Sequence, residues 1–204
     1  MKRLRALCAL VDPCESFIDV GCDHGYAVQY VYQHRLAKRI TACDISAPSL
    51  EKAKRLLDGK EGITFVCADG AAVARGHETV LISGMGGKEM CAVMAACSPK
   101  TFVLSPQSHA YDVRVALSRS GYEIVHDEVI FDHKFYDTIK AVKGAPKTLS
   151  EPELLYGAFV RTKKNDMLVD KLRRALAKAK QFPSTAQNEA KRKTIEEVLL
   201  WQLR

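Results

Sequence analysis

The sequence has no apolar run long enough to cross a membrane. Its N-terminal stretch, residues 1–11, is short and contains Lys2, Arg3 and Arg5, whereas a spanning helix needs roughly 20 predominantly apolar residues. The stretch also lacks the long apolar core of a secretion signal. We therefore expect an amphipathic helix at this end of the chain and no membrane anchor.

Closely spaced cysteine pairs are also missing. The number of cysteines is odd, seven in all, and no two have the C-x-x-C spacing of a metal site or redox motif. No other cluster of metal ligands is visible. Reduced thiols are typical of cytosolic proteins, so we expect a cytoplasmic protein without a metal site.

Glycines are too few to complete the G-x-G-x-x-G fingerprint of dinucleotide-binding proteins. The stretch Asp19–Tyr26 still reads as a strand, a glycine turn and the start of a helix. Gly21 would let the backbone approach a ligand, and the helix N-terminus would offer free N–H groups. A tight turn without any ligand is the alternative interpretation of this stretch alone.

Short apolar runs alternate with helical stretches through the first two thirds of the chain. Each run is continuous rather than alternating, which is typical of parallel strands buried on both faces. The five expected strands are Phe17–Gly21, Arg39–Asp44, Ile63–Cys67, Thr79–Ser83 and Thr101–Leu104. Helices are expected between them, at residues 24–37 and from Ser46 to about Leu57.

The pattern then changes, because the strands Tyr122–Phe131 and Phe135–Val142 are separated by only Asp132–Lys134. A gap this short fits a hairpin and leaves no room for a crossover helix. Five parallel strands followed by an antiparallel pair predict an α/β fold. This predicted arrangement matches the Rossmann-like, seven-stranded sheet of class I methyltransferases.

Strand signals stop near Leu149. Ser150 and Glu153 form a capping-box pattern for a short helix, and residues 165–181 and 185–203 are two long helical runs separated by Pro183–Ser184. We predict an antiparallel, coiled-coil-like helical hairpin. The expected domain boundary lies between residues 148 and 149, with an α/β domain at residues 1–148 and a helical domain at residues 149–204.

Acidic residues follow two more strands of the expected sheet. Asp44 ends the second strand, where a carboxylate can accept hydrogen bonds from ribose hydroxyls, and Asp69–Gly70 follows the third, where a side chain can reach an adenine amino group. A surface turn for Asp44 and a helix cap for Asp69 are the alternatives. Adenosine recognition without a phosphate motif favours S-adenosylmethionine over NAD.

Two loops follow the fourth and fifth strands. In Ser83–Gly87, three glycines permit close approach to a ligand or a flat base, and Met85 either packs near the cofactor or in the core. In Ser105–His109, Gln107 can offer a donor and an acceptor to a base edge. An ordinary loop amide is the alternative for Gln107.

Taken together, these motifs resemble the bacterial tRNA (adenine-22-N1)-methyltransferase family. The motifs are Asp19–Tyr26, Asp69–Gly70, Ser83–Gly87, Leu104–Gln107 followed by Arg114, and Lys134–Tyr136. The resemblance implies methyl transfer from S-adenosylmethionine to N1 of an adenine in tRNA. It implies cofactor contacts from Asp19, Gly21, His24, Asp44, Asp69, Gly70, Gly84 and Met85.

The methylated adenine would be cationic, so a nearby carboxylate would stabilise the charge that develops. Asp23 in the cofactor turn is our candidate, with a helix cap as the alternative. Gln107 would hold the base edge. The family's Q-P-N turn reads Ser105–Gln107 here. Methylation of another RNA or of a small molecule, and a non-catalytic RNA-binding relative, therefore stay open as alternatives.

The chain has a formal net charge of +7, and a basic surface suits a polyanionic partner. Basic residues concentrate in the C-terminal helical region, although a solvated face is the usual meaning of such a run. We therefore expect residues 1–148 to be the S-adenosylmethionine-binding catalytic domain and residues 149–204 to be an RNA-binding domain. We predict tRNA contacts from Arg114, Lys163, Lys164, Arg173, Arg174 and Lys178. The assembly expected is a monomer or a weak homodimer.

Overall fold

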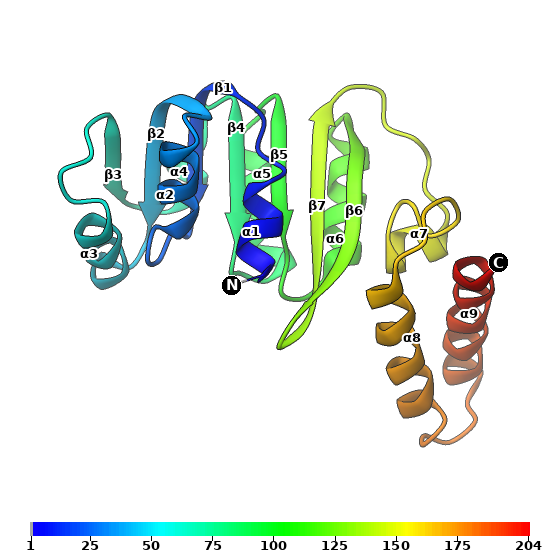
Figure 1. Cartoon of the computed structure of the whole chain (residues 1–204). Helices are drawn as coiled ribbons and strands as arrows, with labels where there is room; N and C mark the ends of the chain where they lie inside the picture. The colour runs from blue at the N-terminus through cyan, green and yellow to red at the C-terminus, as the bar shows by residue number, and fades with distance from the viewer. Residues whose placement is uncertain (1) are drawn as a thin grey trace.

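The structure is a computed structural model that describes residues 2–204. Its centre is a seven-stranded sheet with helices on both faces (Figure 1). The strands are β1 (Cys14–Val20), β2 (Ala37–Asp44), β3 (Ile63–Cys67), β4 (Thr79–Ser83), β5 (Thr101–Ser105), β6 (Tyr122–Asp132) and β7 (Lys134–Lys143). Their order across the sheet is β3-β2-β1-β4-β5-β7-β6.

The first five strands are parallel, and β7 runs antiparallel between β5 and β6. The β6–β7 turn is a single residue, His133, whose φ of 64° is left-handed. Strand order reverses between β1 and β4, and ligands of open α/β sheets bind at such a switch point, beyond the carboxyl ends of the strands. The predicted seven-stranded Rossmann-like sheet is confirmed.

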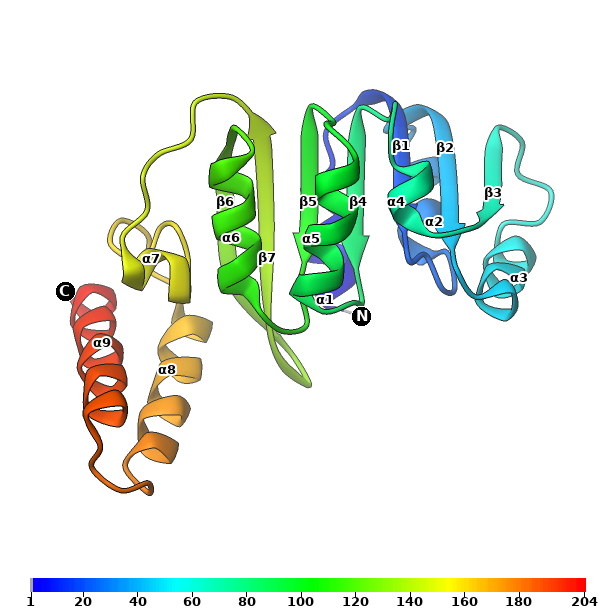
Figure 2. The same cartoon turned by 180° about the vertical axis from the view of Figure 1, so that it is seen from behind.

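Helices cover the two faces of the sheet in two groups. On the face seen in Figure 1, α1 (Lys2–Cys8), α2 (Tyr26–Gln33) and α3 (Ala47–Leu56) pack on one apolar core. On the face seen in Figure 2, α4 (Gly70–Val73), α5 (Gly87–Ala96) and α6 (Ala110–Arg119) pack on the other. Burial on both faces explains why the parallel strands are continuously apolar.

Helix α2 is shorter than the predicted span 24–37. It begins after Gly25, whose φ of 76° is left-handed, and the chain turns again at Arg35, where φ is 53°. Strand β2 then starts at Ala37, two residues before the predicted Arg39. Left-handed backbone at both ends of α2 accounts for the difference.

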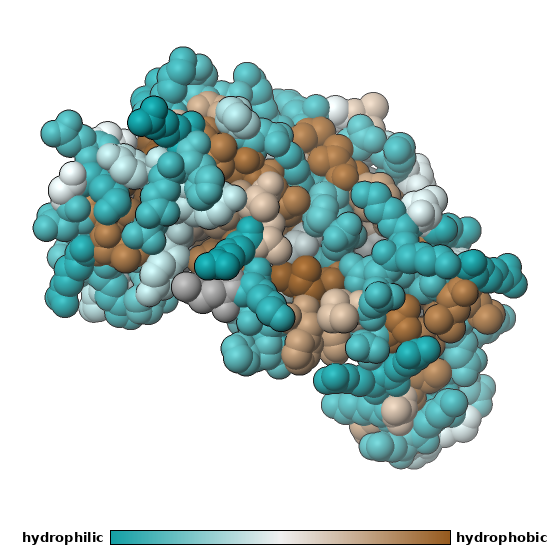
Figure 3. All heavy atoms as spheres, viewed as in Figure 1, coloured by the Kyte–Doolittle hydropathy of each residue, from teal (hydrophilic) through white to brown (hydrophobic). Residues whose placement is uncertain are grey.

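The C-terminal part lies beside β6, at one end of the sheet (Figures 1 and 2). It contains α7 (Glu151–Tyr156), α8 (Asp166–Ala179) and α9 (Ala186–Leu203). Helix α7 begins with the predicted capping box, in which the Ser150 N–H donates to Glu153 Oε2 at 2.8 Å. Helices α8 and α9 are antiparallel neighbours, and their buried Leu172 and Ile195 belong to a third apolar cluster that also includes Val129 of β6. In Figure 3, mostly hydrophilic side chains cover the C-terminal helices, with apolar patches among them.

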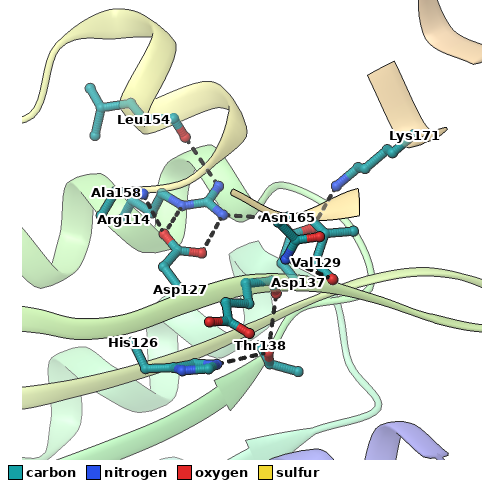
Figure 4. Close-up of polar contacts among 11 residues, drawn as sticks. Arg114, His126, Asp127, Val129, Asp137, Thr138, Leu154, Ala158, Asn165 and Lys171 are labelled. Atoms are coloured by element: carbon teal, nitrogen blue, oxygen red, sulfur yellow. Dashed lines mark hydrogen bonds and ion pairs between the residues drawn. The ribbon is translucent and has the colours of Figure 1, made fainter. Parts of the chain in front are cut away.

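A buried charge network joins the C-terminal part to the sheet (Figure 4). Arg114 of α6 donates to both oxygens of Asp127 of β6, at 2.7 and 2.8 Å, and to Asp137 of β7 at 2.8 Å. It also donates to the Leu154 carbonyl of α7, and Lys171 of α8 donates to Asp137 at 2.9 Å. The network therefore touches five elements of the fold.

Arg114 is 0% exposed, so the prediction that it contacts RNA is wrong. Burial alone would lower the pKa of Arg114, but Asp127 and Asp137 raise it, so the guanidinium stays charged inside the protein. A cation with two carboxylates around it is fully paired where it lies. Basic residues on an exposed helix and a basic residue that pairs with buried acids look alike in sequence.

Within residues 2–204, no helix combines the length and the apolar character needed to cross a bilayer. All seven cysteines are free thiols.

Candidate active site

A cavity of about 550 Å³ lies beyond the carboxyl ends of β1, β2 and β4, at the switch point of the sheet. Its size is within the range of small-ligand pockets. Eight of the predicted catalytic and cofactor-binding residues line it: Asp19, Gly21, Asp23, His24, Asp44, Gly84, Met85 and Gln107. The fold thus brings together residues from four segments that are far apart in the sequence.

The turn after β1 forms the floor of the cavity. Gly21 has a left-handed φ of 75°, and a Cβ added there would lie 3.2 Å from Met85 Cε. Its N–H donates to the Cys43 carbonyl at the end of β2. The left-handed backbone favours glycine here, and a side chain at this position would also have to displace the end of Met85.

Asp19 is the most unusual group in the cavity. It is 2% exposed, and its Oδ1 has no hydrogen-bond partner among the described residues. Burial and the nearby Asp44 raise the pKa of this carboxyl to about 7. An unpaired carboxylate oxygen at a cavity fits a ligand that brings an N–H donor and positive charge.

Asp44 is held in place by the backbone around it. Its two carboxylate oxygens accept hydrogen bonds from the N–H groups of Asp23 and Ser46, at 2.9 and 2.8 Å. A carboxylate has further lone pairs, so it can still accept ligand hydroxyls. Ile45, the next residue, lines the cavity and is 76% exposed, which leaves an apolar surface beside the acid.

Asp23 lies at the mouth of the cavity in a strained conformation, with a φ of 42°. Its carboxylate accepts hydrogen bonds from His24 Nδ1 at 2.7 Å and from Lys52 Nζ at 3.4 Å. Its slight burial alone would raise the pKa of Asp23, but His24 and Lys52 lower it below its usual value. Asp23 is therefore ionised at neutral pH and available to stabilise positive charge.

The loops after β4 and β5 are bound to each other at the opposite wall. Gln107 Nε2 donates to the Gly84 carbonyl at 2.8 Å, and the Gln107 N–H donates to the Met85 carbonyl at 3.0 Å. The Gly87 N–H donates to the Ser108 carbonyl. These bonds fix the amide of Gln107 and leave its Oε1 as an acceptor.

Two of the predicted cofactor residues do not line this cavity. Asp69 caps α4 through a 2.9 Å hydrogen bond from the Ala71 N–H. Gly70 is packed against β1, where an added Cβ would lie only 2.1 Å from Val20 Cγ1. Their contacts with a cofactor stay predictions, and the helix-cap alternative describes Asp69 as the structure has it.

Several lining residues were not predicted. Arg3 of α1 enters the cavity from the far end of the sequence, and its guanidinium lies 4.6 Å from the centre of the Tyr136 ring. Tyr26 at the start of α2 also lines the cavity. Tyr26 belongs to the Asp19–Tyr26 motif and could have been found there, whereas nothing in the sequence indicates that α1 folds back over the site.

The remaining predicted RNA-binding residues, all on the C-terminal part, are exposed: Lys163, Lys164, Arg173, Arg174 and Lys178. The guanidinium of Arg174 lies 5.1 Å from the Phe135 ring and 5.6 Å from the Phe131 ring. It thereby connects α8 to the β6–β7 hairpin. Half-buried Lys171 on the same helix pairs with Asp137 instead of facing solvent.

A methyltransferase-domain family model matches residues 1–139, which hold the cavity and most of the sheet. The chain belongs to this methyltransferase family. The methyltransferase is 29% identical over 152 residues to a Mycoplasma pneumoniae protein named "putative tRNA methyltransferase". That alignment covers 70% of this chain and 71% of the relative.

Solved structures share the fold of this methyltransferase over nearly its whole length. TrmK of M. capricolum, in complex with S-adenosyl-homocysteine, has a TM-score of 0.88 at 18% identity and covers 98% of both chains. The B. subtilis m1A22 tRNA methyltransferase TrmK has a TM-score of 0.75 at 22% identity, covering 99% of this chain and 96% of that one. The likeness includes the C-terminal helices, because the coverage extends beyond residue 139.

Proposed function

We propose that this protein transfers a methyl group from S-adenosylmethionine to N1 of adenine 22 in tRNA. The observation that carries the proposal is the buried, unpaired Asp19 carboxylate in a cavity that also contains Asp44 and Ile45. TrmK of M. capricolum, which has the same fold, binds S-adenosyl-homocysteine, the product of the cofactor. TrmK of B. subtilis, which also has this fold, is an m1A22 tRNA methyltransferase. The relative from M. pneumoniae is also named as a tRNA methyltransferase.

The residues of the cavity fit S-adenosylmethionine, which supplies the methyl group when it is bound. Asp19 would accept hydrogen bonds from the ammonium group of S-adenosylmethionine, because its Oδ1 has no other partner among the described residues. Asp44 would accept hydrogen bonds from the ribose hydroxyls, and Ile45 would cover a face of the adenine ring. Gly21 leaves the space beside Met85 into which a side chain would otherwise project.

The base to be methylated would be held at the mouth of the cavity. Gln107 Oε1 would accept a hydrogen bond from the adenine amino group, since its Nε2 is already bonded to Gly84. Once N1 is methylated, the adenine carries a positive charge. The ionised Asp23 carboxylate would stabilise this charge as it develops, and its lowered pKa suits this role better than that of a proton acceptor.

We assign residues 1–148 to cofactor binding and catalysis and residues 149–204 to tRNA binding. The support is the exposed basic surface of α8 and the loop before it, because phosphate contacts supply much of the affinity for nucleic acid. A tRNA substrate and seven free thiols favour a cytoplasmic location.

The deciding experiment incubates the protein with labelled S-adenosylmethionine and an unmodified tRNA transcript, followed by nucleoside analysis. We expect N1-methyladenosine from a transcript with adenine at position 22 and none from the same transcript with guanine there. A different methylated nucleoside, or no transfer by a protein that binds the cofactor, would refute the proposal.

The tRNA-binding assignment is tested by the charge reversals Arg173→Glu and Lys178→Glu. We expect KM for tRNA to rise roughly tenfold, because two phosphate contacts become repulsive, with unchanged affinity for S-adenosylmethionine. The matched control is Arg55→Glu on α3, an exposed residue at the opposite end of the sheet (Figure 1). An unchanged KM would remove the helices from the tRNA interface.

A further inference from the structure

A second cavity, of about 570 Å³, lies between α1 and α2 on the face seen in Figure 1. Leu4 and Tyr26 line both this groove and the catalytic cavity, so the two spaces are neighbours. The groove extends from Tyr26 at the start of α2 to His34 just beyond its end. None of the residues proposed for cofactor binding or catalysis lines it.

One side of the groove is a stripe along α2. Tyr26, Gln29, Tyr30, Gln33 and His34 occur at i, i+3, i+4, i+7 and i+8, which places them on one side of the helix. The opposite face of α2 is buried in the core. The stripe therefore presents rings and amides to the groove.

The rings of this stripe already form stacked pairs that a base would extend. Tyr30 stacks on His34 within 21° at a centroid distance of 4.0 Å, and Tyr26, which is 41% exposed, stacks on His24. Within residues 2–204, the side-chain amides of Gln29 and Gln33 form no hydrogen bond. Aromatic side chains that stack on bases, beside groups that can pair with base edges, are typical of sites for single-stranded RNA.

The charge of the groove favours an anion. Arg5 of α1 lines it, no aspartate or glutamate does, and α1 contains three basic and no acidic residues, Lys2, Arg3 and Arg5. The catalytic cavity next to it contains Asp19 and Asp44 and suits a cationic ligand. The two cavities therefore have opposite electrostatic preferences.

We propose that the groove between α1 and α2 binds unpaired nucleotides adjacent to the target adenine. Their bases would stack along the α2 stripe and a phosphate would bind Arg5. The proposal rests on the proposed function and adds to it a second RNA contact, on the sheet side of the molecule. Because Tyr26 lines both cavities, an RNA strand bound in the groove would continue directly into the catalytic cavity.

The test uses Arg5→Ala, Gln33→Ala and the double variant, which alter exposed side chains and leave the core intact. We expect the dissociation constant for an unmodified tRNA transcript to rise roughly fivefold for Arg5→Ala and further for the double variant. Affinity for S-adenosylmethionine should stay within twofold of wild type. The control is Arg55→Ala on α3, which should change neither.

Ultraviolet crosslinking of the transcript to wild-type protein gives a second readout. We expect crosslinked peptides to contain Tyr30, which lines the groove and not the catalytic cavity. Unchanged tRNA affinity of the double variant, or crosslinks only to α8 and α9, would overturn the proposal. Loss of S-adenosylmethionine affinity in Arg5→Ala would also overturn it, since the groove would then serve the cofactor. A wild-type protein that binds no tRNA would instead refute the proposed function.

Discussion

Asp19 should couple cofactor binding to the release of a proton. Its carboxyl is 2% exposed, and burial together with Asp44 raises its pKa to about 7. A cationic ligand requires the ionised form. Below pH 7, binding must therefore displace a proton, and the apparent affinity should fall as the pH falls.

The size of the effect follows from the fraction of Asp19 that is ionised. With a pKa of about 7, roughly half of the carboxyl is ionised at pH 7 and about 3% at pH 5.5. The apparent affinity for S-adenosylmethionine should thus fall roughly fifteenfold over this range, or about 1.6 kcal/mol. The ammonium group of the ligand stays largely protonated throughout.

Isothermal titration calorimetry between pH 5.5 and 7, in two buffers of different ionisation enthalpy, measures both the affinity and the protons released. Asp19→Asn should bind weakly with no dependence on pH in this range. The control His24→Asn removes the titratable imidazole that lines the same cavity and should keep the slope. A flat wild-type profile, or a slope that survives in Asp19→Asn, would refute the reasoning.

Three further results are expected. The free energy of unfolding of wild type, relative to that of Asp19→Asn, should fall by about 3 kcal/mol from pH 5 to pH 8. The reason is that the pKa of this carboxyl is about 7 in the folded state and 3.8 in the unfolded state, so the folded state binds more protons in this range. Urea denaturation of both proteins at both pH values checks this, and an equal change in the two proteins would contradict it. Arg114→Met should lower the free energy of unfolding by about 3–5 kcal/mol in the same assay, because Asp127 and Asp137 lose their buried partner. A decrease below about 1 kcal/mol would show that the charge network is not needed for stability. Asp23→Asn should lower kcat roughly 100-fold with unchanged cofactor affinity, measured by methyl transfer to tRNA; a normal kcat would leave Asp23 as a structural residue.

The sheet was predictable because its strands obey local rules. Strands β3 and β4 have the predicted limits, and the short gap at Asp132–Lys134 was enough to indicate the hairpin. The capping box at Ser150 also depends only on residues three positions apart. Patterns of this kind are set by neighbours in the sequence, so the sequence alone contains them.

The cavity was predictable where its residues follow strands. Asp19, Gly21 and Asp44 lie at the carboxyl ends of β1 and β2 and had to converge once those strands paired in parallel. Arg3 and Arg114 could not be placed in this way. The position of Arg3 depends on packing against Asp132, which is more than 100 residues away in the sequence. The position of Arg114 depends on buried acids from two later strands. The expected monomer or weak homodimer and the expected lack of a metal site stay predictions.

The charge network around Arg114 affects how this protein can be divided. A cut at residue 148 falls in a loop, but Ala158, Leu154 and Lys171 beyond it complete the bonds of Asp127, Arg114 and Asp137 before it. Removing residues 149–204 would therefore leave Arg114, Asp127 and Asp137 without these partners and open to water at the edge of the sheet. A chimaera that exchanges the C-terminal helices between two relatives should keep these acids and bases matched, so the natural unit of exchange begins at α6.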